Sequence, residues 1–303
     1  MGALFLLLIF AFGASIGSFL NVVIYRVPRG LSVVRPASRC PACETPLRLR
    51  DNVPVLGWLL LGGRCAHCRA PISARYPLVE FATGLLAVAL FTDLAGGLLT
   101  PARAADPRFA QDVIVPFVLY FTFVASLVAA SFIDLDWFIL PDGLTLGPLA
   151  LGPLTAFAAG HTVGVTWTDA LVGAAAGAGV LLLTLGAYGA LTGRVGLGGG
   201  DWKLLALIGG WLGWPSLPFV LGAGALQGLV FAVAFRRAFA VADLPPDPLD
   251  PAPALPDHAA PAAPVSFRHL AVPFGPFLAL AAVEFLLFRD ELRGLFAHAA
   301  GLR

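Results

Sequence analysis

The sequence is poor in charged residues. Only 12% of its 303 residues are Asp, Glu, Lys or Arg, whereas 58% are hydrophobic and the mean hydropathy is +0.86. A water-soluble domain cannot bury that much apolar surface, so the composition excludes a soluble globular enzyme and predicts a polytopic membrane protein. The shortage of Lys and Arg also argues against nucleic acid as the main ligand, because phosphate binding requires concentrated positive charge.

The first hydrophobic segment lacks the features of a cleaved secretory signal. It runs from Ala3 to Val27, has no charged residue before its apolar stretch, and leads into Arg26 and Arg29 rather than into a small-residue cleavage site. An apolar stretch of about 25 residues is also too long for the hydrophobic region of a signal peptide. We expect a retained first transmembrane span.

Seven further segments are apolar enough to be transmembrane helices, for which about 20 residues are needed. The expected fold is therefore an all-α polytopic membrane protein with about eight transmembrane helices. The Gly and Pro residues inside several segments are compatible with this, because neighbouring helices satisfy the freed backbone groups. The expected spans cover roughly residues 3–27, 78–99, 114–134, 143–160, 169–191, 202–215, 216–235 and 269–288.

Arginine content predicts the orientation. Residues 26–76 contain nine arginines, and their only acidic residues are Glu44 and Asp51. Basic loops remain in the cytoplasm, so this loop is expected there and the N-terminus outside. Counting spans from this loop places residues 135–142 and 192–201 in the cytoplasm as well. The end of the third span and the start of the sixth are then on the same side of the membrane.

The chain has only four cysteines, and all of them are in the basic loop. They form two Cys-x-x-Cys pairs, a pattern that fits four thiolates around one tetrahedral zinc ion, with Cys40, Cys43, Cys65 and Cys68 as the expected ligands. The reducing cytoplasm disfavours disulfides, and a metal would supply the folding energy that a small loop with few apolar residues lacks. Redox chemistry at the paired cysteines is the alternative.

Five regions are expected along the chain. The loop after residue 237 is rich in Pro, Ala and Asp and cannot build a packed core, so it is expected to be an extended cytoplasmic linker. The expected regions are a first span (1–27), a cytoplasmic zinc-binding domain (28–77), a membrane core (78–237), the acidic linker (238–267), and a last span with its tail (268–303).

Two aspartates are placed where carboxylates are costly. Asp134 ends the third apolar segment, and Asp201 opens the sixth directly after a run of glycines. An ionisable group at such a position suggests function. Two carboxylates held close together cannot both ionise easily, so one keeps a proton, as peptide hydrolysis by acid and base requires. We expect Asp134 and Asp201 to share one water molecule at the membrane surface.

Other residues nearby have more ordinary interpretations. Asp136 and Asp142 are typical of interfacial aspartates that pair with a cation or cap a helix, and Asp142 suits the N-cap of the fourth span. Gly198 and Gly200 would allow close approach of the backbone, and Lys203 is near enough to tune the charge of Asp201. A proton-coupled transporter or channel remains open, because membrane carboxylates also relay protons. A phosphate-binding loop is disfavoured, because Gly-Lys-Ser/Thr is missing.

Several stretches together resemble one known family. They are Gly17–Pro28 (GSFLNVVIYRVP), both cysteine pairs, Asn52–Val55 (NVPV), Ala74–Glu80 (ARYPLVE), Asp134–Asp142 and Gly198–Lys203. The chain resembles the type IV prepilin leader peptidases, membrane aspartic proteases of Gly-x-Gly-Asp type that also methylate the new N-terminus of their product. The resemblance covers most of residues 10–215. Gly-x-Gly-Asp alone also occurs in presenilin-like proteases, but its combination with the cysteine loop is specific.

The resemblance implies roles for particular residues. The family's catalytic aspartates fall on Asp134, seven residues before Pro141, and on Asp201, with Asp136 as a competitor for the first role. It implies that the protein cleaves prepilins or pseudopilins, the subunits of type IV pili or type II secretion systems, and removes their basic leader by cutting after a Gly. The reaction would take place at the cytoplasmic face of the bacterial inner membrane. S-adenosylmethionine would be the methyl donor, although the chain has no Rossmann glycine signature.

One departure from the family pattern and two rival functions accompany this interpretation. Val195-Gly196 stands where family members often carry Glu-Gly, so no carboxylate is available there. The rivals are a proton-coupled membrane transporter that uses the same aspartates and a non-catalytic pilus-assembly scaffold whose zinc loop binds the machinery.

Overall fold

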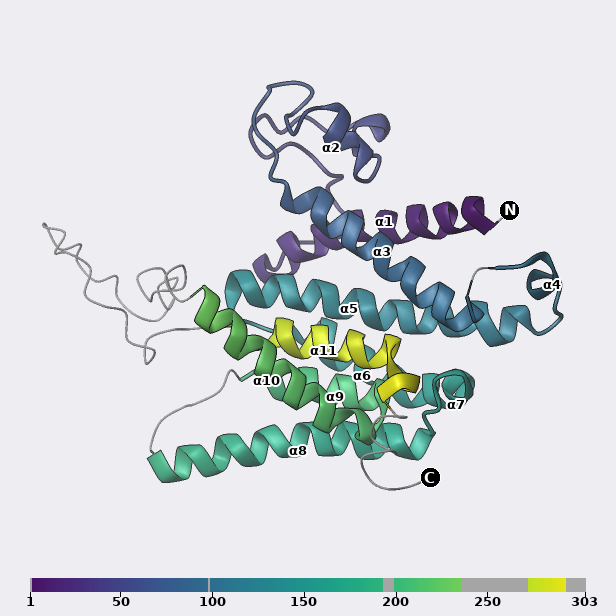
Figure 1. Cartoon of the computed structure of the whole chain (residues 1–303). Coiled ribbons are helices and arrows are strands. Elements are labelled where there is room, and N and C mark those ends of the chain that lie inside the picture. Colours follow the sequence, from purple (N-terminus) through teal and green to yellow (C-terminus); the bar gives the residue numbers. More distant parts are fainter. Residues whose placement is uncertain (1, 98, 193–198, 236–271, 293–303) are drawn as a thin grey trace, which may run out of the picture.

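The computed structural model describes residues 2–97, 99–192, 199–235 and 272–292 (Figure 1). Within these ranges the regular elements are helices, and the only strand-like pairings are two isolated β-bridges in the cysteine-rich loop. The expected all-helical fold is confirmed. The linker 238–267 and most of the C-terminal tail lie outside the described residues.

Five of the described helices are long and apolar enough to cross a membrane. A sixth span results if α6 (Asp142–Leu149) and α7 (Leu151–Val163) are counted as one, although they bend by 50° at the break between them. Pro148 lies in the last turn of α6, where its missing N–H and its ring interrupt the helical hydrogen bonds. The five long helices are α1 (Gly2–Arg26), α3 (Arg75–Ala95), α5 (Val115–Trp137), α8 (Trp167–Thr192) and α10 (Leu217–Ala234).

Two of the eight expected segments form helices that are shorter than a full membrane span. Helix α9 (Asp201–Leu212) has 12 residues and α11 (Gly275–Leu287) has 13. At 1.5 Å per residue they are about 18–20 Å long, whereas the hydrocarbon core of a bilayer is about 30 Å thick. The segment expected as one span at 143–160 is the bent pair of helices α6 and α7. Both short helices are largely buried, so they form the centre of the bundle rather than its wall.

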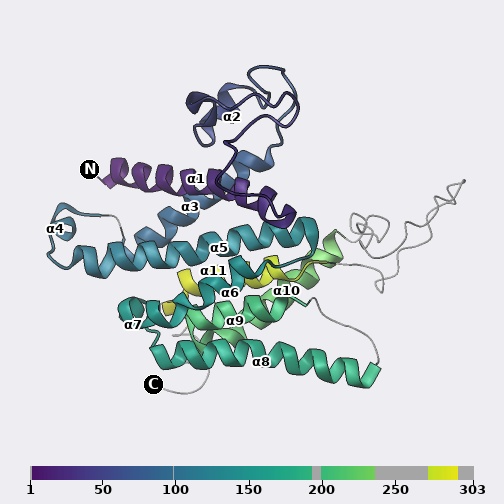
Figure 2. The same ribbon diagram turned by 180° about the vertical axis from the view of Figure 1, so that it is seen from behind.

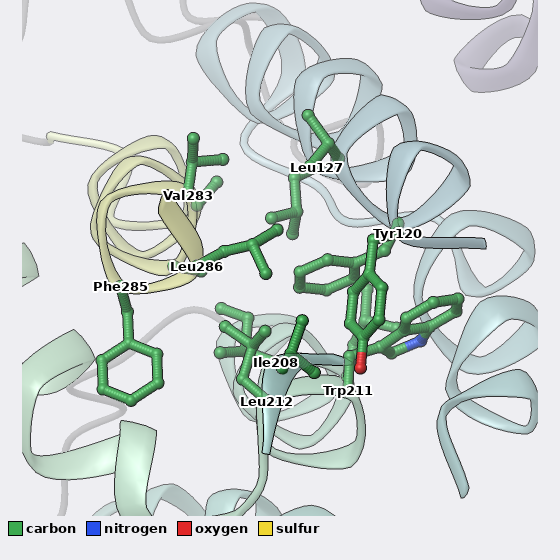
Figure 3. Packing of buried hydrophobic residues seen from close by; sticks show 14 of the residues in the cluster. Tyr120, Leu127, Ile208, Trp211, Leu212, Val283, Phe285 and Leu286 are labelled. Atoms are coloured by element: carbon green, nitrogen blue, oxygen red, sulfur yellow. The ribbon is translucent and has the colours of Figure 1, made fainter. Parts of the chain in front are cut away.

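The core lies between α5, α9 and α11 (Figure 3). The ring of Trp211 stacks on Phe123 with 5.1 Å between centroids and meets the edge of Tyr120 at 5.8 Å. Its indole Nε1 donates a hydrogen bond to the carbonyl of Pro148 at 2.9 Å, so the buried N–H is satisfied at the end of α6. The other labelled side chains of this cluster are Leu127, Ile208, Leu212, Val283, Phe285 and Leu286.

Glycines let α8 and α9 approach closely. A Cβ atom at Gly173 would collide with the carbonyl oxygen of Gly209, and one at Gly209 would collide with the carbonyl oxygen of Gly173. Small residues at such contacts allow the backbones of membrane helices to pack tightly. This packing holds α9, and with it Asp201, in a fixed position.

The loop between α1 and α3 carries α2 (Leu56–Leu60) and stands to one side of the bundle in both views (Figure 1, Figure 2). Helix α3 begins beside this loop and ends near α4 (Pro101–Ala104) and the start of α5. Helix α5 therefore runs back, so that its last turn lies at the end of the bundle where α3 begins.

An ion pair closes the opposite end of the bundle. Arg289, which is 7% exposed, lies just after α11 and donates to Asp93 near the end of α3 at 2.6 Å. Arg289→Ala is expected to lower the free energy of unfolding by about 3 kcal/mol, because it leaves the Asp93 carboxylate without its cation. Thermal unfolding in detergent, followed by tryptophan fluorescence, would measure this. The control is Arg108→Ala at an exposed position; equal stability of both variants would contradict the prediction.

Candidate active site

Asp134 lies in the last turn of α5 and is 5% exposed. The helix ends at Trp137, and the next residue, Phe138, adopts the left-handed conformation (φ 54°) and donates its N–H to the carbonyl of Asp134 at 2.9 Å. The chain then turns through Leu140 and Pro141 into α6. The end of α5 thus places a carboxylate inside the protein but near the end of a helix.

Asp201 is the first residue of α9 and is 7% exposed. The preceding Gly200 packs against Leu140, and a Cβ atom at Gly200 would lie only 2.8 Å from the Cβ of Leu140. The expected close approach at Gly200 is therefore observed, and it brings the start of α9 next to the turn that follows α5. Gly198 lies outside the described residues.

The structure brings Asp134 and Asp201 together. The last turn of α5 and the start of α9 meet where Gly200 packs against Leu140, and the charge of Asp201 is near enough to act on the Asp134 carboxylate. Helix α11 joins them, because the N–H of Gly275 donates to Asp134 Oδ2 at 3.0 Å. Leu204, one turn after Asp201, comes within 3.5 Å of a Cβ atom placed on Gly275. Two buried carboxylates within reach of each other's charge can divide one proton between them.

The other two aspartates of this region form ion pairs. Asp136 accepts a hydrogen bond from Arg75 at 2.7 Å, and both side chains are about one-third exposed. Asp142 pairs with Lys203. The expectation that Asp142 caps the fourth span is wrong: the N-cap of α6 is Pro141, and Asp142 is the first helical residue, where its charge still complements the helix dipole. Lys203 contacts Asp142, so any influence on Asp201 is indirect.

The four cysteines form the expected cluster. Their Sγ atoms all lie within 4.8 Å of one another, and Cys40 Sγ and Cys68 Sγ are 3.8 Å apart. Four thiolates around zinc, at about 2.3 Å from the ion, have sulfur–sulfur distances of about 3.8 Å in a regular tetrahedron. The cluster can therefore hold one metal ion without a large rearrangement.

The two Cys-x-x-Cys pairs are built alike. In the first, Glu44 N–H donates to the carbonyl of Cys40 at 2.9 Å; in the second, Arg69 N–H donates to that of Cys65 at 3.1 Å. Glu44 and Arg69 both have positive φ, at 55° and 60°. His67 approaches the cluster through its backbone N–H, which donates to Cys65 Sγ at 3.4 Å. The same local fold at both pairs points their sulfurs at a common centre.

Hydrogen bonds lower the pKa of two of the thiols. Hydrogen bonds with Thr45 lower the pKa of the Cys43 thiol to about 6, and the backbone N–H groups of Cys68 and His67 lower the pKa of the Cys65 thiol. Donors of this kind favour thiolate, the form that binds metals.

Two family models match the chain. The bacterial peptidase A24 N-terminal domain matches residues 11–94, and the type IV leader peptidase family matches residues 121–233. A prepilin leader peptidase/N-methyltransferase of Aeromonas hydrophila is 38% identical over 313 aligned positions, which cover 95% of this chain and 92% of that protein. The chain belongs to the type IV leader peptidase family.

Two further relatives extend this result. A protein with the same description from Klebsiella pneumoniae is 41% identical over 70% of this chain and 87% of its own length. Another, from Stutzerimonas stutzeri, is 31% identical over 98% of this chain and 96% of its own length. Among solved structures, no significant match is found. The predicted resemblance is confirmed, and nothing in the family favours the transporter alternative. The matched ranges contain all four cysteines and both buried aspartates, whereas α11 lies outside them.

Two contacts, and the partner of a third, were not anticipated from the sequence. Glu80, buried in α3, accepts the Val55 N–H at 2.7 Å and so ties the cysteine-rich loop to the membrane helices. Arg75 reaches Asp136, and Gly275 reaches Asp134. A Glu inside an apolar segment is a signal that could have indicated Glu80. No local pattern connects Gly275 with a residue 141 positions earlier.

Proposed function

We propose that this protein removes the basic leader from prepilins or pseudopilins and methylates the new N-terminus of the product. Asp134 and Asp201 are the acid and base of the cleavage step, at the cytoplasmic face of the bacterial inner membrane. The observation that carries the proposal is a pair of buried carboxylates, near enough to interact electrostatically, at the end of α5 and the start of α9 in a chain of this family.

The chemistry follows from the pairing. The ionised carboxylate takes a proton from a water molecule, whose oxygen attacks the carbonyl carbon of the leader's last Gly. The protonated carboxylate gives its proton to the carbonyl oxygen, and collapse of the tetrahedral species then breaks the C–N bond and transfers a proton to the leaving amine. Asp134 and Asp201 titrate as one pair, so neither has an independent role in the pH profile.

The position of the pair suits a substrate that is itself embedded in the membrane. A prepilin presents a basic leader in the cytoplasm followed by a hydrophobic helix in the bilayer, and its cleavage site lies where the two meet. The carboxylates lie at the end of the bundle near the start of α3, which carries the arginine-rich loop. Positive charge in that loop favours its cytoplasmic location.

Zinc bound by Cys40, Cys43, Cys65 and Cys68 would stabilise the loop rather than react. The four thiolates leave no open coordination position, which is typical of structural zinc. S-adenosylmethionine supplies the methyl group when it is bound. The four cysteines fit a metal ion. For the methyl donor, the described residues carry no glycine-rich motif of the dinucleotide-binding type that would locate its site.

One experiment scores both activities. The purified full-length protein is incubated in detergent with a prepilin and S-adenosylmethionine, and the N-terminus of the product is analysed by mass spectrometry. The expected product has lost its leader and gained one methyl group. Intact prepilin after incubation with folded protein would refute the peptidase proposal. A transporter would instead show flux in proteoliposomes, and a scaffold would support pilus assembly even with both aspartates replaced.

Arg75 is expected to support cleavage by holding the end of α5. Its guanidinium bonds to Asp136 at 2.7 Å and to the carbonyl of Phe132 at 3.1 Å, two residues on either side of Asp134. Arg75→Ala should lower kcat for prepilin cleavage by about tenfold, equivalent to about 1.4 kcal/mol of activation free energy.

Arg75→Lys should recover only part of the lost rate, because an ammonium lacks the planar fork that reaches both acceptors. Arg48→Ala, at an exposed position in the same loop, serves as the control. If Arg75→Ala and Arg48→Ala cleave equally fast, Arg75 has no such role.

A further inference from the structure

The start of α11 makes an unusual contact. The first four N–H groups of an α-helix have no partner within the helix. In α11 the N–H of Gly275, the first helical residue, donates to Oδ2 of Asp134 at 3.0 Å, and both groups are buried. A proposed catalytic carboxylate therefore caps a helix that begins 141 residues later in the chain.

No side chain fits at this position. A Cβ atom on Gly275 would lie 2.6 Å from Asp134 Oδ2 and 3.2 Å from its Cγ. Real Cβ atoms do not approach so closely, so any larger residue must displace either the carboxylate or the start of α11. The absence of a side chain is what allows the N–H and the carboxylate to meet.

The contact also offsets an electrostatic cost. Asp134 lies in the last turn of α5, where the negative end of the helix dipole disfavours a carboxylate. The N-terminus of α11 carries partial positive charge and points at the same carboxylate. The dipole of helix α11 thus stabilises the Asp134 carboxylate, whereas the dipole of α5 disfavours it.

We propose that Gly275 is a positioning residue for catalysis: its N–H fixes the orientation in which Asp134 faces Asp201, so that α11 completes the active site. This inference rests on the proposed peptidase function. It extends the site to a third element, one that lies outside both matched family ranges. The residue acts through Asp134 and does not touch the substrate.

The test compares Gly275→Ala with Gly222→Ala in the full-length protein. Gly222 lies in α10, and a Cβ atom there meets nothing within 4 Å. Gly275→Ala should lower kcat for prepilin cleavage by about 10- to 100-fold, as displacement of a reacting group by a fraction of an ångström to 1 Å does, and leave KM within about twofold. Equal kcat values for the two variants, or a raised KM at unchanged kcat, would overturn the inference.

A second measurement does not depend on activity or on the folding of Gly275→Ala. Hydrogen exchange is followed in the peptide that spans the start of α11, in Asp134→Asn and in Asp134→Ala. Asn keeps an oxygen that can accept the Gly275 N–H, so this amide should remain protected; Ala removes the acceptor, and exchange should accelerate by about tenfold or more. Identical exchange in both variants would contradict the contact. If the wild-type protein does not cut prepilin while these exchange rates differ, the proposed function fails and the Gly275–Asp134 contact stands.

Discussion

Asp134→Asn and Asp201→Asn are each expected to reduce the rate of prepilin cleavage by about 10²- to 10⁴-fold, the range that general acid–base catalysis contributes. An amide can neither take a proton from water nor give one to the carbonyl oxygen. Both aspartates are buried, and exchange of a carboxylate for a neutral amide of the same shape removes a costly buried charge. The variants should therefore stay folded, and Asn at position 134 keeps an acceptor for the Gly275 N–H.

The measurement is a timed cleavage assay in detergent with Asp136→Asn and Asp142→Asn as matched controls. Asp136 lies two residues after Asp134 and is ion-paired with Arg75 at the surface. Asp142 directly follows Pro141 and is ion-paired with Lys203 at the surface. Surface pairs contribute about 1 kcal/mol or less, so the controls should lose no more than about tenfold in rate. Cleavage at the control rate by both buried-site variants would exclude the acid–base pair.

The meeting of Asp134 and Asp201 was predictable because it depends on topology. An even number of membrane crossings between two segment ends returns the chain to the same side, and arginine content predicts which side that is. The two crossings between them are the bent pair of α6 and α7 and the long helix α8, which run in opposite directions, so the count holds although the first crossing is bent. The cysteine cluster was predictable for a simpler reason, since equal spacing in two pairs builds two similar turns.

The burial of α9 at the centre of the bundle could not be predicted in the same way. A segment that is apolar on every side can be a membrane span or a buried core helix, and periodicity does not separate the two. What decides is the packing of Trp211 against Phe123 and the close approach of Gly209 to Gly173, both of which join residues far apart in sequence. The pairing of Lys203 with Asp142 is equally non-local, which is why a helix cap was expected there instead.

The contact of α11 with Asp134 could not be predicted from the sequence for a related reason. Gly275 follows Pro273-Phe274 and precedes Pro276, a pattern that predicts only a helix start. Its importance comes from the Asp134 carboxylate, which lies on another helix. Glycine in a membrane segment has several common explanations, including close helix packing, so the residue alone does not indicate a catalytic neighbour.

The second large effect is expected at the cluster of four cysteines. Cys40→Ser or Cys65→Ser should abolish stoichiometric zinc binding by the purified protein and unfold the cysteine-rich loop locally. Structural zinc contributes about 10–16 kcal/mol of apparent free energy in small domains, far more than the hydrogen bonds of this loop can replace. Metal analysis and limited proteolysis of the loop would measure both results. His67→Ala is the control, because His67 meets the cluster through its backbone N–H.

Cleavage should suffer less than the loop does. The buried carboxylates are held by α5, α9 and α11, and none of these helices belongs to the loop. Because Val55 bonds to Glu80 and Arg75 bonds to Asp136, an unfolded loop still loosens the end of α5, and a loss of up to about tenfold in kcat is expected. If a cysteine variant keeps a protease-resistant loop but no longer cleaves prepilin, the cysteines take part directly in the cleavage reaction. Absence of zinc from wild-type protein with four reduced cysteines would refute the metal site.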